Sequence, residues 1–369
     1  MTIMRSLTMT YSLADQNFKQ TKSVGIFNVS TQLLENLSKH VHFTQLSLLS
    51  NSTLKGKLNL SPEVSIKYHD QAIGSRLGRI LWDQWGVYEA MKKSGNEWLF
   101  LPKGFAAFLR RPAFKVAVYS YDSIHEFYRI HYPNAISWFE RRYFTQSLKA
   151  TLKHANLIFT DSDFAKDELR RLAFSFKLYP PKIITAGIGF SEYKNLPSVK
   201  RNSILFLTSS WPHKLTTRGV NFIERWQRRT GFSGSVDLVG SLPVGLRLPQ
   251  LKGWRHHSRL PEQAYRKFLS ESKALLFFSA YEGFGMPPVE AVIAGTCPVF
   301  SDLSVTREVM GERGYLFSND SYESFEESLN KALSVSETQI KLWAEQLLQR
   351  HNWEKVVARI IQGLEQVRK

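Results

Sequence analysis

The sequence predicts an α/β protein with two domains, each built on a mainly parallel β-sheet. Short apolar segments rich in β-branched residues alternate with amphipathic helical segments along most of the chain, and this alternation is typical of parallel sheets covered by helices. The length of 369 residues is about twice that of a typical single domain. Hydrophobic residues make up 43% of the chain, which is enough for packed cores and excludes a disordered protein.

The first half of the chain begins with an apolar strand, followed by a helix that starts at Gly25. Apolar residues at helical spacing define that helix, and a basic last turn before Gly95 marks the end of the next one. The predicted elements are a strand at 5–11, a helix from 25 onward, a strand at 41–49, a helix at 80–92, strands at 98–101 and 115–119, a helix at 136–154, a strand at 155–160, a helix at 164–172 and a strand at 178–185.

The second half repeats this rhythm after a polar segment, residues 191–200, which contains Pro197 and lacks periodicity. We interpret this segment as the interdomain linker. The predicted elements that follow it are a strand at 203–208, a helix at 220–229, a strand at 236–239, a helix at 261–270, a strand at 274–278, a helix from about 286 and a closing helix at 353–367. The two halves predict two Rossmann-like domains that face each other across a cleft.

The chain carries a formal charge of +17, and residues 1–195 are its more basic part, with 26 Lys and Arg against 15 Asp and Glu. This excess predicts an anionic partner: nucleic acid, anionic lipid or a phosphorylated substrate. The single cysteine, Cys297, has no partner for an internal disulfide, so we expect a small buried residue in a reducing compartment. No apolar run approaches the ~20 residues of a membrane span, and the N-terminal residues lack the apolar core of a signal peptide. We therefore expect a cytoplasmic protein.

The most informative motif is Glu-Gly-Phe-Gly-Met-Pro-Pro-Val-Glu, residues 282–290, which follows a predicted buried strand. Because proline is tolerated in the first turn of a helix, its two prolines place a helix start near Met286. The free backbone amides of Gly283, Phe284 and Gly285 then lie at the helix N-terminus, where they and the helix dipole can hold an anionic diphosphate.

Glu282 and Glu290 flank this turn, and their carboxylates are suited to accept hydroxyl donors from a sugar and from a ribose. Without the surrounding motif, the same two residues would be interpreted as a helix cap and a solvated helix residue. The strand, the glycine-rich turn and the helix together favour the binding role.

The spacing of Glu282 and Glu290 matches the E-x7-E signature of retaining GT-B glycosyltransferases, and the whole motif resembles that of glycosyltransferase family 4. The resemblance covers nearly the whole chain. It continues through residues 294–299, 302–309, 314–317 and 353–356, and in the first half through residues 25–27, 121–133 and 155–164, where the order is similar to that of a mannosyltransferase-like subgroup.

This resemblance implies a GT-B fold and retaining transfer of a hexose-type sugar from a nucleotide diphosphate sugar to a glycan or lipid-linked acceptor, without a metal or other cofactor. It implies an acceptor-binding domain at 1–195, a nucleotide-sugar-binding domain at 196–350 and a helix at 351–369 that crosses back to the first domain. Proteins of this kind often build bacterial surface polysaccharide or glycolipid.

The resemblance also assigns roles to individual residues. Glu282, Lys214 and Asp122 are implied to be catalytic, and Lys214 would neutralise the leaving diphosphate, although an ordinary surface lysine remains an alternative. The implied donor-binding residues are Gly283, Phe284, Gly285, Glu290 and Arg218. The implied acceptor-side residues are Gly25, Tyr121 and His125.

Two positions depart from the family pattern. Thr208 stands where many relatives have an arginine, and Arg218 is either its replacement or a solvated helix residue. Tyr121 stands where the subgroup usually has a histidine. Any imidazole role then belongs to His125 or His131, while a lone histidine in an apolar helix is more often structural.

Two other motifs resemble metal ligands. Asp161-Ser162-Asp163 has the form of a metal-binding D-x-D motif, but its place between a strand and a helix favours a helix cap. His256-His257 lacks further ligands at metal-binding spacing, so we interpret the pair as surface residues.

Two other functions remain open on sequence grounds. A non-catalytic nucleotide-sugar-binding or scaffold member of the family would fit the residues at 121 and 208, whereas intact Glu282, Glu290 and Lys214 favour an enzyme. A nucleic-acid-binding protein would fit the charge, but no motif supports it, and we expect no nucleic acid partner. The basic first domain favours a peripheral position on the anionic inner face of the plasma membrane, where each nearby Lys or Arg contributes about 1 kcal/mol.

Overall fold

The computed structural model describes residues 7–17, 24–40, 43–193 and 199–367, and these divide into two compact units. The first unit contains Met1–Glu126, Ser137–Gly189 and Trp353–Lys369, and the second contains Phe127–Ile136 and Phe190–Asn352. Residues 127–136 therefore pack with the second unit, whereas the sequence placed them in the first domain. The predicted boundary between residues 195 and 196 lies outside the described residues.

The first unit is built on a seven-stranded parallel sheet with the order β3-β2-β1-β4-β5-β6-β7. Its central strands are short and fully buried, as expected when helices cover both faces of a sheet. The strands are β1 (Leu7–Ser12), β2 (Phe43–Ser50), β3 (Ser65–Tyr68), β4 (Trp98–Leu101), β5 (Lys115–Ser120), β6 (Leu157–Thr160) and β7 (Lys182–Thr185).

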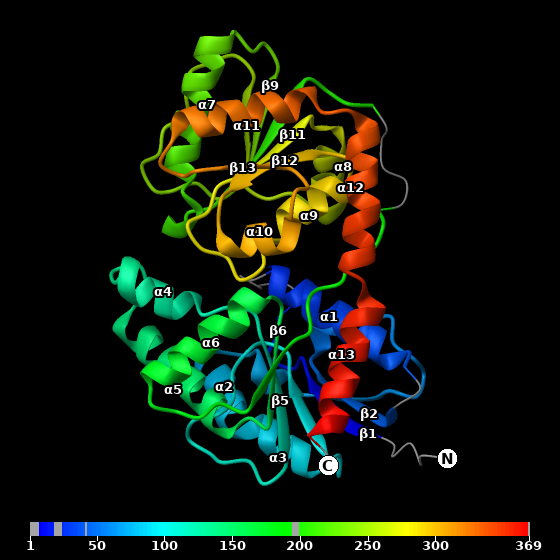
Figure 1. The fold of residues 1–369 in the computed structure, drawn as a ribbon. Coiled ribbons are helices and arrows are strands. Elements are labelled where there is room, and N and C mark those ends of the chain that lie inside the picture. The colour runs from blue at the N-terminus through cyan, green and yellow to red at the C-terminus, as the bar shows by residue number, and fades with distance from the viewer. Residues whose placement is uncertain (1–6, 18–23, 41–42, 194–198, 368–369) are drawn as a thin grey trace. The chain divides into compact units, whose positions relative to one another are not determined.

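Helices cover both faces of this sheet (Figure 1). Leucines of α5 and α6 pack with Trp82 and residues of α3 in one core, while α1 and α13 lie together against the opposite face. Gly363 lets α13 approach closely, because a Cβ there would lie 2.8 Å from Ile184 Cδ1. The helices of this part of the chain are α1 (Val24–Ser38), α2 (Arg76–Leu81), α3 (Val87–Lys92), α4 (Ile124–His131), α5 (Trp138–His154), α6 (Asp163–Ser175) and α13 (Trp353–Gln366).

The predicted helix at 80–92 is interrupted. Helix α2 ends at Leu81, and a π-helical turn, η3 (Trp82–Gly86), leads into α3. A π turn adds a residue to the helical repeat, so that Trp82 and Gln84 face the interior while Trp85 is exposed. Two short 3₁₀ turns, η1 (Ser52–Leu54) and η2 (Asp70–Ala72), complete this unit's elements.

The second unit is built on a six-stranded parallel sheet with the order β10-β9-β8-β11-β12-β13. The strands are β8 (Ser203–Thr208), β9 (Ser235–Gly240), β10 (Trp254–His257), β11 (Ala274–Phe277), β12 (Cys297–Ser301) and β13 (Tyr315–Phe317). The helices are η4 (Pro212–Lys214), a 3₁₀ turn, then α7 (Thr216–Thr230), α8 (Glu262–Glu271), α9 (Met286–Ile293), α10 (Ser304–Met310), α11 (Tyr322–Ser334) and α12 (Glu337–Arg350).

An aromatic cluster fills one face of this sheet. Phe278 lies at its centre, with ring centroids 5.5 Å from Phe206, 4.5 Å from Phe317 and 5.4 Å from Phe325. Helices α7 and α11 cover this face, and α8 and α9 cover the other, where α12 packs on α9 (Figure 1).

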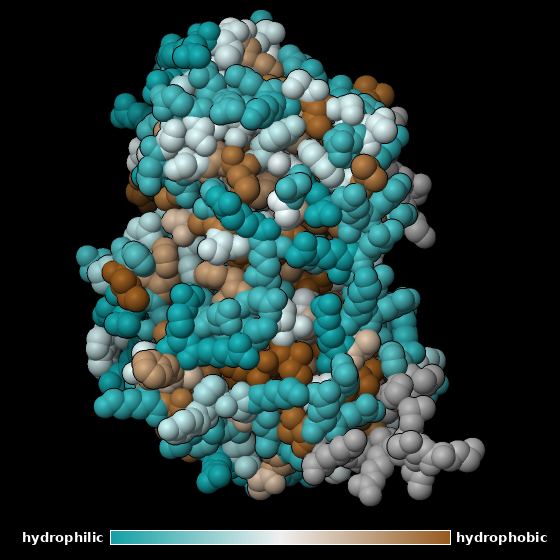
Figure 2. All heavy atoms as spheres, viewed as in Figure 1, coloured by the Kyte–Doolittle hydropathy of each residue, from teal (hydrophilic) through white to brown (hydrophobic). Residues whose placement is uncertain are grey.

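The predicted α/β fold with two parallel sheets of the GT-B type is confirmed. In the described part of the chain, no helix is both long enough and apolar enough to cross a membrane. Figure 2 shows that hydrophilic side chains cover most of the visible face and that apolar side chains appear between them.

Candidate functional site

The order of the second sheet marks a ligand position. Strands β9 and β10 extend from one side of β8, whereas β11, β12 and β13 extend from the other. Open parallel sheets bind ligands at the carboxyl ends of the two strands between which the order reverses. We call this position the switch point of the sheet. The loop after β8 carries Lys214, and the loop after β11 carries Glu282. Two of the predicted site residues therefore lie in the loops that follow the two strands on either side of the reversal.

Lys214 and Glu282 form an ion pair there. Lys214 Nζ lies 2.5 Å from Glu282 Oε1, and the two side chains are 26% and 13% exposed. The same ammonium lies 5.1 Å from the centre of the Phe277 ring. The pair is thus partly desolvated but open to solvent on one side, and a ligand entering there meets a cation and a carboxylate together.

The backbone holds the two loops against each other. The Ala280 N–H donates to the His213 carbonyl at 2.7 Å, and the Ser279 hydroxyl donates to the Tyr281 carbonyl at 2.9 Å. Leu215 directly follows Lys214 and has a φ of 48°, a left-handed conformation that costs a non-glycine residue roughly 1–2 kcal/mol. Such strain persists only where the surrounding contacts fix the conformation.

His213 is buried beside this pair. Its Nδ1 lies 2.5 Å from the Tyr128 hydroxyl, which belongs to the same unit. Burial and the neighbouring Lys214 ammonium lower the pKa of the His213 imidazole to about 3. The ring is therefore neutral near pH 7, and it positions Lys214 without adding a second charge. Sequence reasoning missed His213, for which the only signal was its place next to Lys214.

The glycine-rich turn starts helix α9 as predicted. Gly285 caps the helix with a φ of 81°, and prolines occupy its first turn. The Phe284 side chain is buried, with its ring centroid 6.0 Å from that of Phe190 and 5.3 Å from that of His351. Because this side chain anchors the turn, the backbone at the start of α9 is held at the switch point, where the helix dipole favours an anion.

A polar network supports the loop after β11. The Asn319 side-chain amide donates to the Ser279 carbonyl at 2.8 Å, and its oxygen accepts from the Ser301 hydroxyl at 2.7 Å. The Ser279 N–H donates to Ser301 Oγ at 2.8 Å. The strands β11 and β12 and the loop after β13 thus fix the entry to the turn that carries Glu282.

Glu290 faces helix α8. The Tyr265 hydroxyl donates to Glu290 Oε2 at 3.2 Å, and burial raises the pKa of this carboxyl above its usual value. Nearby, the Arg266 guanidinium lies 4.5 Å from the centre of the Tyr193 ring. Tyr265 is a residue that sequence reasoning missed, because the spacing of α8 and α9 in the chain does not show that they pack side by side.

Arg218 lies in the first turn of α7 and contacts the loop after β13. Its guanidinium donates to the Asn319 carbonyl at 2.9 Å and pairs with Asp320 at 2.7 Å. Thr208 is the buried last residue of β8. A donor-binding role for Arg218 therefore stays a prediction, and the described contacts tie its charge to Asp320.

The first sheet has a comparable reversal between β1 and β4. Asp15 follows β1, and its buried carboxylate pairs with Lys103, which follows β4. Lys103 Nζ lies 2.9 Å from Asp83 Oδ1, and Arg79 lies 3.9 Å from Asp15. Burial lowers the pKa of Lys103 to about 7 and raises that of Asp83 to about 7. Sequence reasoning missed this pair, because Asp15 and Lys103 are 88 positions apart in the chain.

The predicted acceptor-side residues and the predicted catalytic residue Asp122 lie elsewhere in this unit. Gly25 is the second residue of α1. Tyr121, after β5, is buried, and its hydroxyl lies 3.2 Å from Ser30 Oγ. Burial raises the pKa of Tyr121. The Asp122 carboxylate accepts the Ile124 N–H at 3.1 Å at the start of α4. Their assigned roles remain predictions.

His125 stacks on Phe144. The two ring centroids lie 3.6 Å apart with an angle of 7° between the planes, and the Phe105 ring lies 6.1 Å away. Burial lowers the pKa of this imidazole to about 4, although Glu126 and Glu140 act in the opposite direction. These contacts favour the structural interpretation of His125 over an acceptor-side role.

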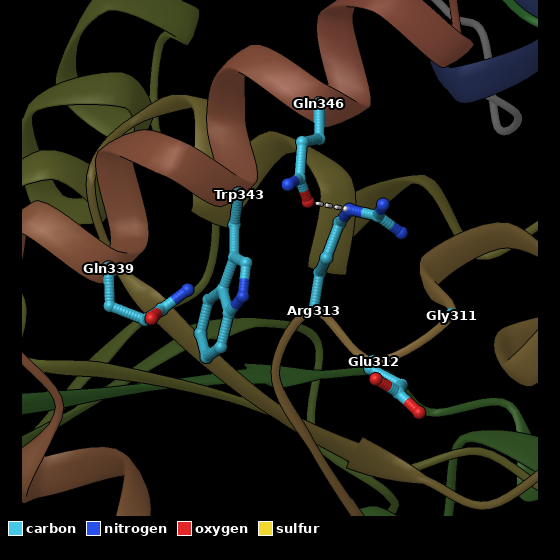
Figure 3. Close-up of a pocket in the computed structure, with 6 residues that line it drawn as sticks. All are labelled: Gly311, Glu312, Arg313, Gln339, Trp343 and Gln346. Carbon is cyan, nitrogen blue, oxygen red and sulfur yellow. Dashed lines mark hydrogen bonds between the residues drawn. The ribbon is translucent and has the colours of Figure 1, made fainter.

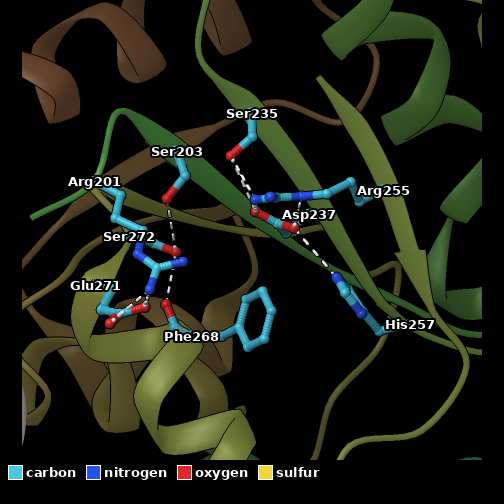
Figure 4. Close-up of polar contacts among 9 residues, drawn as sticks. All are labelled: Arg201, Ser203, Ser235, Asp237, Arg255, His257, Phe268, Glu271 and Ser272. Atoms are coloured by element: carbon cyan, nitrogen blue, oxygen red, sulfur yellow. Dashed lines mark hydrogen bonds and ion pairs between the residues drawn. The ribbon is translucent and has the colours of Figure 1, made fainter. Parts of the chain in front are cut away.

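The two metal-like motifs have structural contacts. Ser162 is the N-cap of α6, and its side chain accepts the Ala165 N–H. On β10, His257 Nε2 lies 3.2 Å from Oδ1 of the buried Asp237, which Arg255 also pairs with at 2.7 Å (Figure 4). Among the described residues, no three His, Cys, Asp or Glu side chains are grouped as metal ligands.

A separate pocket of about 520 Å³ lies between α12 and the loop before β13 (Figure 3). Trp343 and Gln346 of α12 line one side of it and Arg313 the other, and Arg313 Nε donates to Gln346 Oε1 at 2.8 Å. None of its lining residues belongs to the switch-point site of the second sheet.

Comparison with known proteins identifies a family model, two curated relatives and several solved structures that are similar to this chain. Residues 250–345 match the family model of glycosyl transferases group 1, and the match includes Glu282 and Glu290. The O-antigen chain mannosyltransferase RfbU of Salmonella typhimurium is 25% identical over 213 residues, which are 56% of this chain and 59% of that protein. The O-antigen chain mannosyltransferase B of Escherichia coli is 25% identical over 198 residues, 47% of this chain and 50% of that protein.

Both alignments thus span between half and three fifths of the relatives' own length. Among solved structures, the sucrose-phosphate synthase of Thermosynechococcus elongatus has a similar fold. Its TM-score is 0.70 at 14% sequence identity, and the match covers 98% of this chain and 99% of that one. The chain therefore has a GT-B-type fold, and residues 250–345 are similar to the glycosyl transferases group 1.

Proposed function

We propose that this chain is a retaining glycosyltransferase that moves a hexose from a nucleotide diphosphate sugar to a glycan or lipid-linked acceptor in bacterial surface polysaccharide synthesis. The group 1 match supports glycosyl transfer. The similarity to two O-antigen chain mannosyltransferases supports mannose as the sugar and an O-antigen chain as the acceptor, for which we propose a lipid-linked form. An acceptor of that kind places the enzyme at the cytoplasmic face of a membrane.

One observation carries the proposal: the Lys214–Glu282 pair lies at the switch point of the second sheet, beside the N-terminus of α9. A nucleotide diphosphate sugar has a dianionic bridge next to a polyhydroxylated ring. Lys214 and the helix N-terminus suit the diphosphate, and the Glu282 carboxylate suits the sugar hydroxyls, because a carboxylate accepts two donors at once.

Lys214 and Glu282 each have a proposed role in the transfer reaction. The bond between the sugar C1 and the diphosphate oxygen breaks, and Lys214 stabilises the negative charge that develops on that oxygen. The acceptor hydroxyl bonds to C1 from the same face, and its proton passes to the leaving phosphate oxygen. Glu282 holds the sugar during this exchange. The ion pair between Lys214 and Glu282 holds both side chains in position.

The nucleoside is assigned to Glu290. Its carboxyl, the Tyr265 hydroxyl and the Arg266–Tyr193 pair form a polar and aromatic group beside α9. A ribose donates hydroxyls to a carboxylate in this way, and an aromatic ring offers a flat surface to a base. We assign the acceptor to the first unit, where Asp15 and Lys103 lie at the second switch point.

Hydrolysis of nucleotide sugars tests this function without a known acceptor. Purified protein is incubated with UDP-, GDP- and ADP-sugars, and the anomer released first is identified by NMR. Release of the sugar with its original configuration, together with loss of release in Glu282→Ala at an unchanged melting temperature, is expected. A shift of the melting temperature by the nucleotide sugar without any turnover would instead identify a non-catalytic binding member of the family.

A further inference from the structure

We propose that one face of the first unit, built from α2, η3, the loop 102–114 and the start of α5, docks on an anionic membrane surface. We call it the docking face. Its six exposed apolar side chains are Leu77, Leu81, Trp85, Leu109, Trp138 and Phe139. The inference rests on the proposed function only for its reason to bind a membrane, since docking itself requires no turnover.

The exposure of these side chains is large. Leu77 and Trp138 are each 66% exposed, and Leu109 is 56% exposed. Six of the fifteen exposed large apolar side chains among the described residues lie on this face. Scattered exposed apolar residues need no explanation, but a contiguous group of them marks an interaction surface.

Contacts show that the segments form one surface. The Arg76 guanidinium of α2 pairs with Glu140 of α5 at 3.0 Å and lies 5.8 Å from the centre of the Phe139 ring. Gln84 Oε1 of η3 accepts the Leu109 N–H of the loop at 3.1 Å. These bonds join α2 to α5 and η3 to the loop 102–114, so the apolar residues of all four segments belong to one face.

The helical spacing explains why the apolar side chains point outward. Leu77, Leu81 and Trp85 recur every four residues, whereas Trp82 and Tyr88 face the interior. The segment thus has apolar residues on two sides: one side fills the core, and the other is left open. A helix in a soluble protein buries a single apolar stripe, so the second stripe requires an external apolar surface.

The charge of this face selects the kind of surface. The segments 75–92, 102–114 and 137–149 hold nine Lys and Arg residues against three acidic ones, and of the nine only Lys103, which is largely buried against Asp15 and Asp83, is left out of this surface. The Arg142 guanidinium lies 5.8 Å from the centre of the Trp138 ring. Tryptophan and arginine together are typical of the interface between lipid headgroups and acyl chains. Apolar insertion and attraction to anionic lipid are the two signals that stable peripheral binding needs.

Flotation with lipid vesicles tests the docking face in the full-length protein. The vesicles contain phosphatidylglycerol and phosphatidylcholine, or phosphatidylcholine alone. Binding to the mixed vesicles at low salt, and weaker binding to phosphatidylcholine, is expected. The double variant Trp138→Asn/Phe139→Asn should bind the mixed vesicles with an affinity lowered by about tenfold or more, because two exposed aromatic side chains no longer insert. Arg142→Gln should reduce binding about fivefold at low salt.

A matched control separates insertion from a general loss of surface hydrophobicity. Phe174 is 86% exposed at the end of α6, outside the docking face, and Phe174→Asn should bind vesicles like the wild type. Equal binding by the wild type and the double variant, or no binding to anionic vesicles at low salt, would overturn the inference. Sedimentation showing a wild-type dimer that the double variant disrupts would identify a self-association surface and would also overturn it.

Different measurements test the docking face and the proposed function, so each can be contradicted without the other. Nucleotide-sugar hydrolysis without vesicles should be equal in the wild type and in the Trp138→Asn/Phe139→Asn variant. Vesicle binding without hydrolysis would contradict the proposed function alone, and hydrolysis without vesicle binding would contradict the docking face alone.

Discussion

Lys214 Nζ lies 2.5 Å from Glu282 Oε1, although 68 positions separate the two residues in the chain. They meet because they follow β8 and β11, two neighbouring parallel strands at the point where the strand order reverses. Each strand delivers its loop to the same edge of the sheet. The short distance between Lys214 and Glu282 is therefore a consequence of the sheet topology. The backbone hydrogen bond from the Ala280 N–H to the His213 carbonyl holds the two loops together.

The first prediction concerns this pair. Lys214→Met should lower the kcat of nucleotide-sugar cleavage by about 10²–10³-fold, the size of effect seen when one transition-state donor is lost. Adding Glu282→Gln should lower it by much less than the product of the two single effects, because the residues act on one ligand. Lys331→Met is the control, since Lys331 forms an exposed ion pair with Glu327 at 2.7 Å away from the site. Independent, multiplicative effects would contradict a shared ligand.

The second prediction concerns the turn before α9. Gly285→Ala forces a φ of 81° on a residue with a Cβ, while the nearest side-chain atom, Thr306 Cγ2, stays 3.6 Å away. Strain alone should then cost about 1 kcal/mol of unfolding free energy, and turnover should fall because the amides move. Gly245→Ala is matched to it, with a φ of 80° and open space around it. Chemical denaturation should show similar losses of stability in both variants, and equal turnover in both would exclude a role for the turn.

The third prediction concerns the nucleoside. Tyr265→Phe removes the hydroxyl that donates to Glu290 Oε2, so the KM for the nucleotide sugar should rise about tenfold with little change in kcat. Tyr322→Phe removes an equivalent hydroxyl, which donates to Glu326 Oε1 at 3.2 Å in α11. Both variants should lose about 1 kcal/mol of stability. Steady-state kinetics distinguish them, and a KM for Tyr265→Phe equal to that for Tyr322→Phe would argue against the assignment.

The fourth prediction concerns acid stability. The pKa of His125 is lowered from its usual 6.5 to about 4, so between these pH values the unfolded chain binds a proton that the folded protein does not. Stability from this group is complete above pH 6.5 and falls as the pH drops toward 4, by about 1.4 kcal/mol per pH unit. His125→Phe keeps the stacking on Phe144 and should remove this part of the slope.

Urea denaturation of both proteins at several pH values measures that difference. The variant should gain stability relative to the wild type as the pH falls from 6.5 to 4. It should also keep its transfer activity, because the stacked ring at Phe144 suits a structural role. Parallel stability curves, or a large loss of activity in the variant, would show that His125 acts in the site instead.

The elements that the sequence predicted correctly are those in which one property dominates. The buried strands β4 and β11 are continuous apolar runs, and the glycine and prolines at 285–288 determine the start of α9. The strands β3 and β10 were missed because β3 is exposed at a sheet edge and β10 is largely polar. Neither shows the alternation by which a half-buried strand is recognised.

The site divides in the same way. Glu282 could be singled out because a local motif and a resemblance mark it, whereas Lys214 could be singled out through the resemblance alone. Tyr265 could not, since its role depends on the packing of α8 beside α9. The Asp15–Lys103 pair follows from the pairing of β1 with β4, which no local pattern reveals. Sequence reasoning therefore singled out the two residues that form the ion pair and missed residues of other elements that contact the predicted site.

The release of nucleoside diphosphate from nucleotide sugars tests the central claim most directly. The wild type and the control Lys331→Met should release it from at least one of the UDP-, GDP- and ADP-sugars. Lys214→Met and Glu282→Gln should release it about 10²-fold or more slowly, with all four proteins equally folded by circular dichroism. Release by Lys214→Met at the wild-type rate, or no release by the wild type from any of these sugars, would contradict the assignment of a catalytic donor site to Lys214 and Glu282.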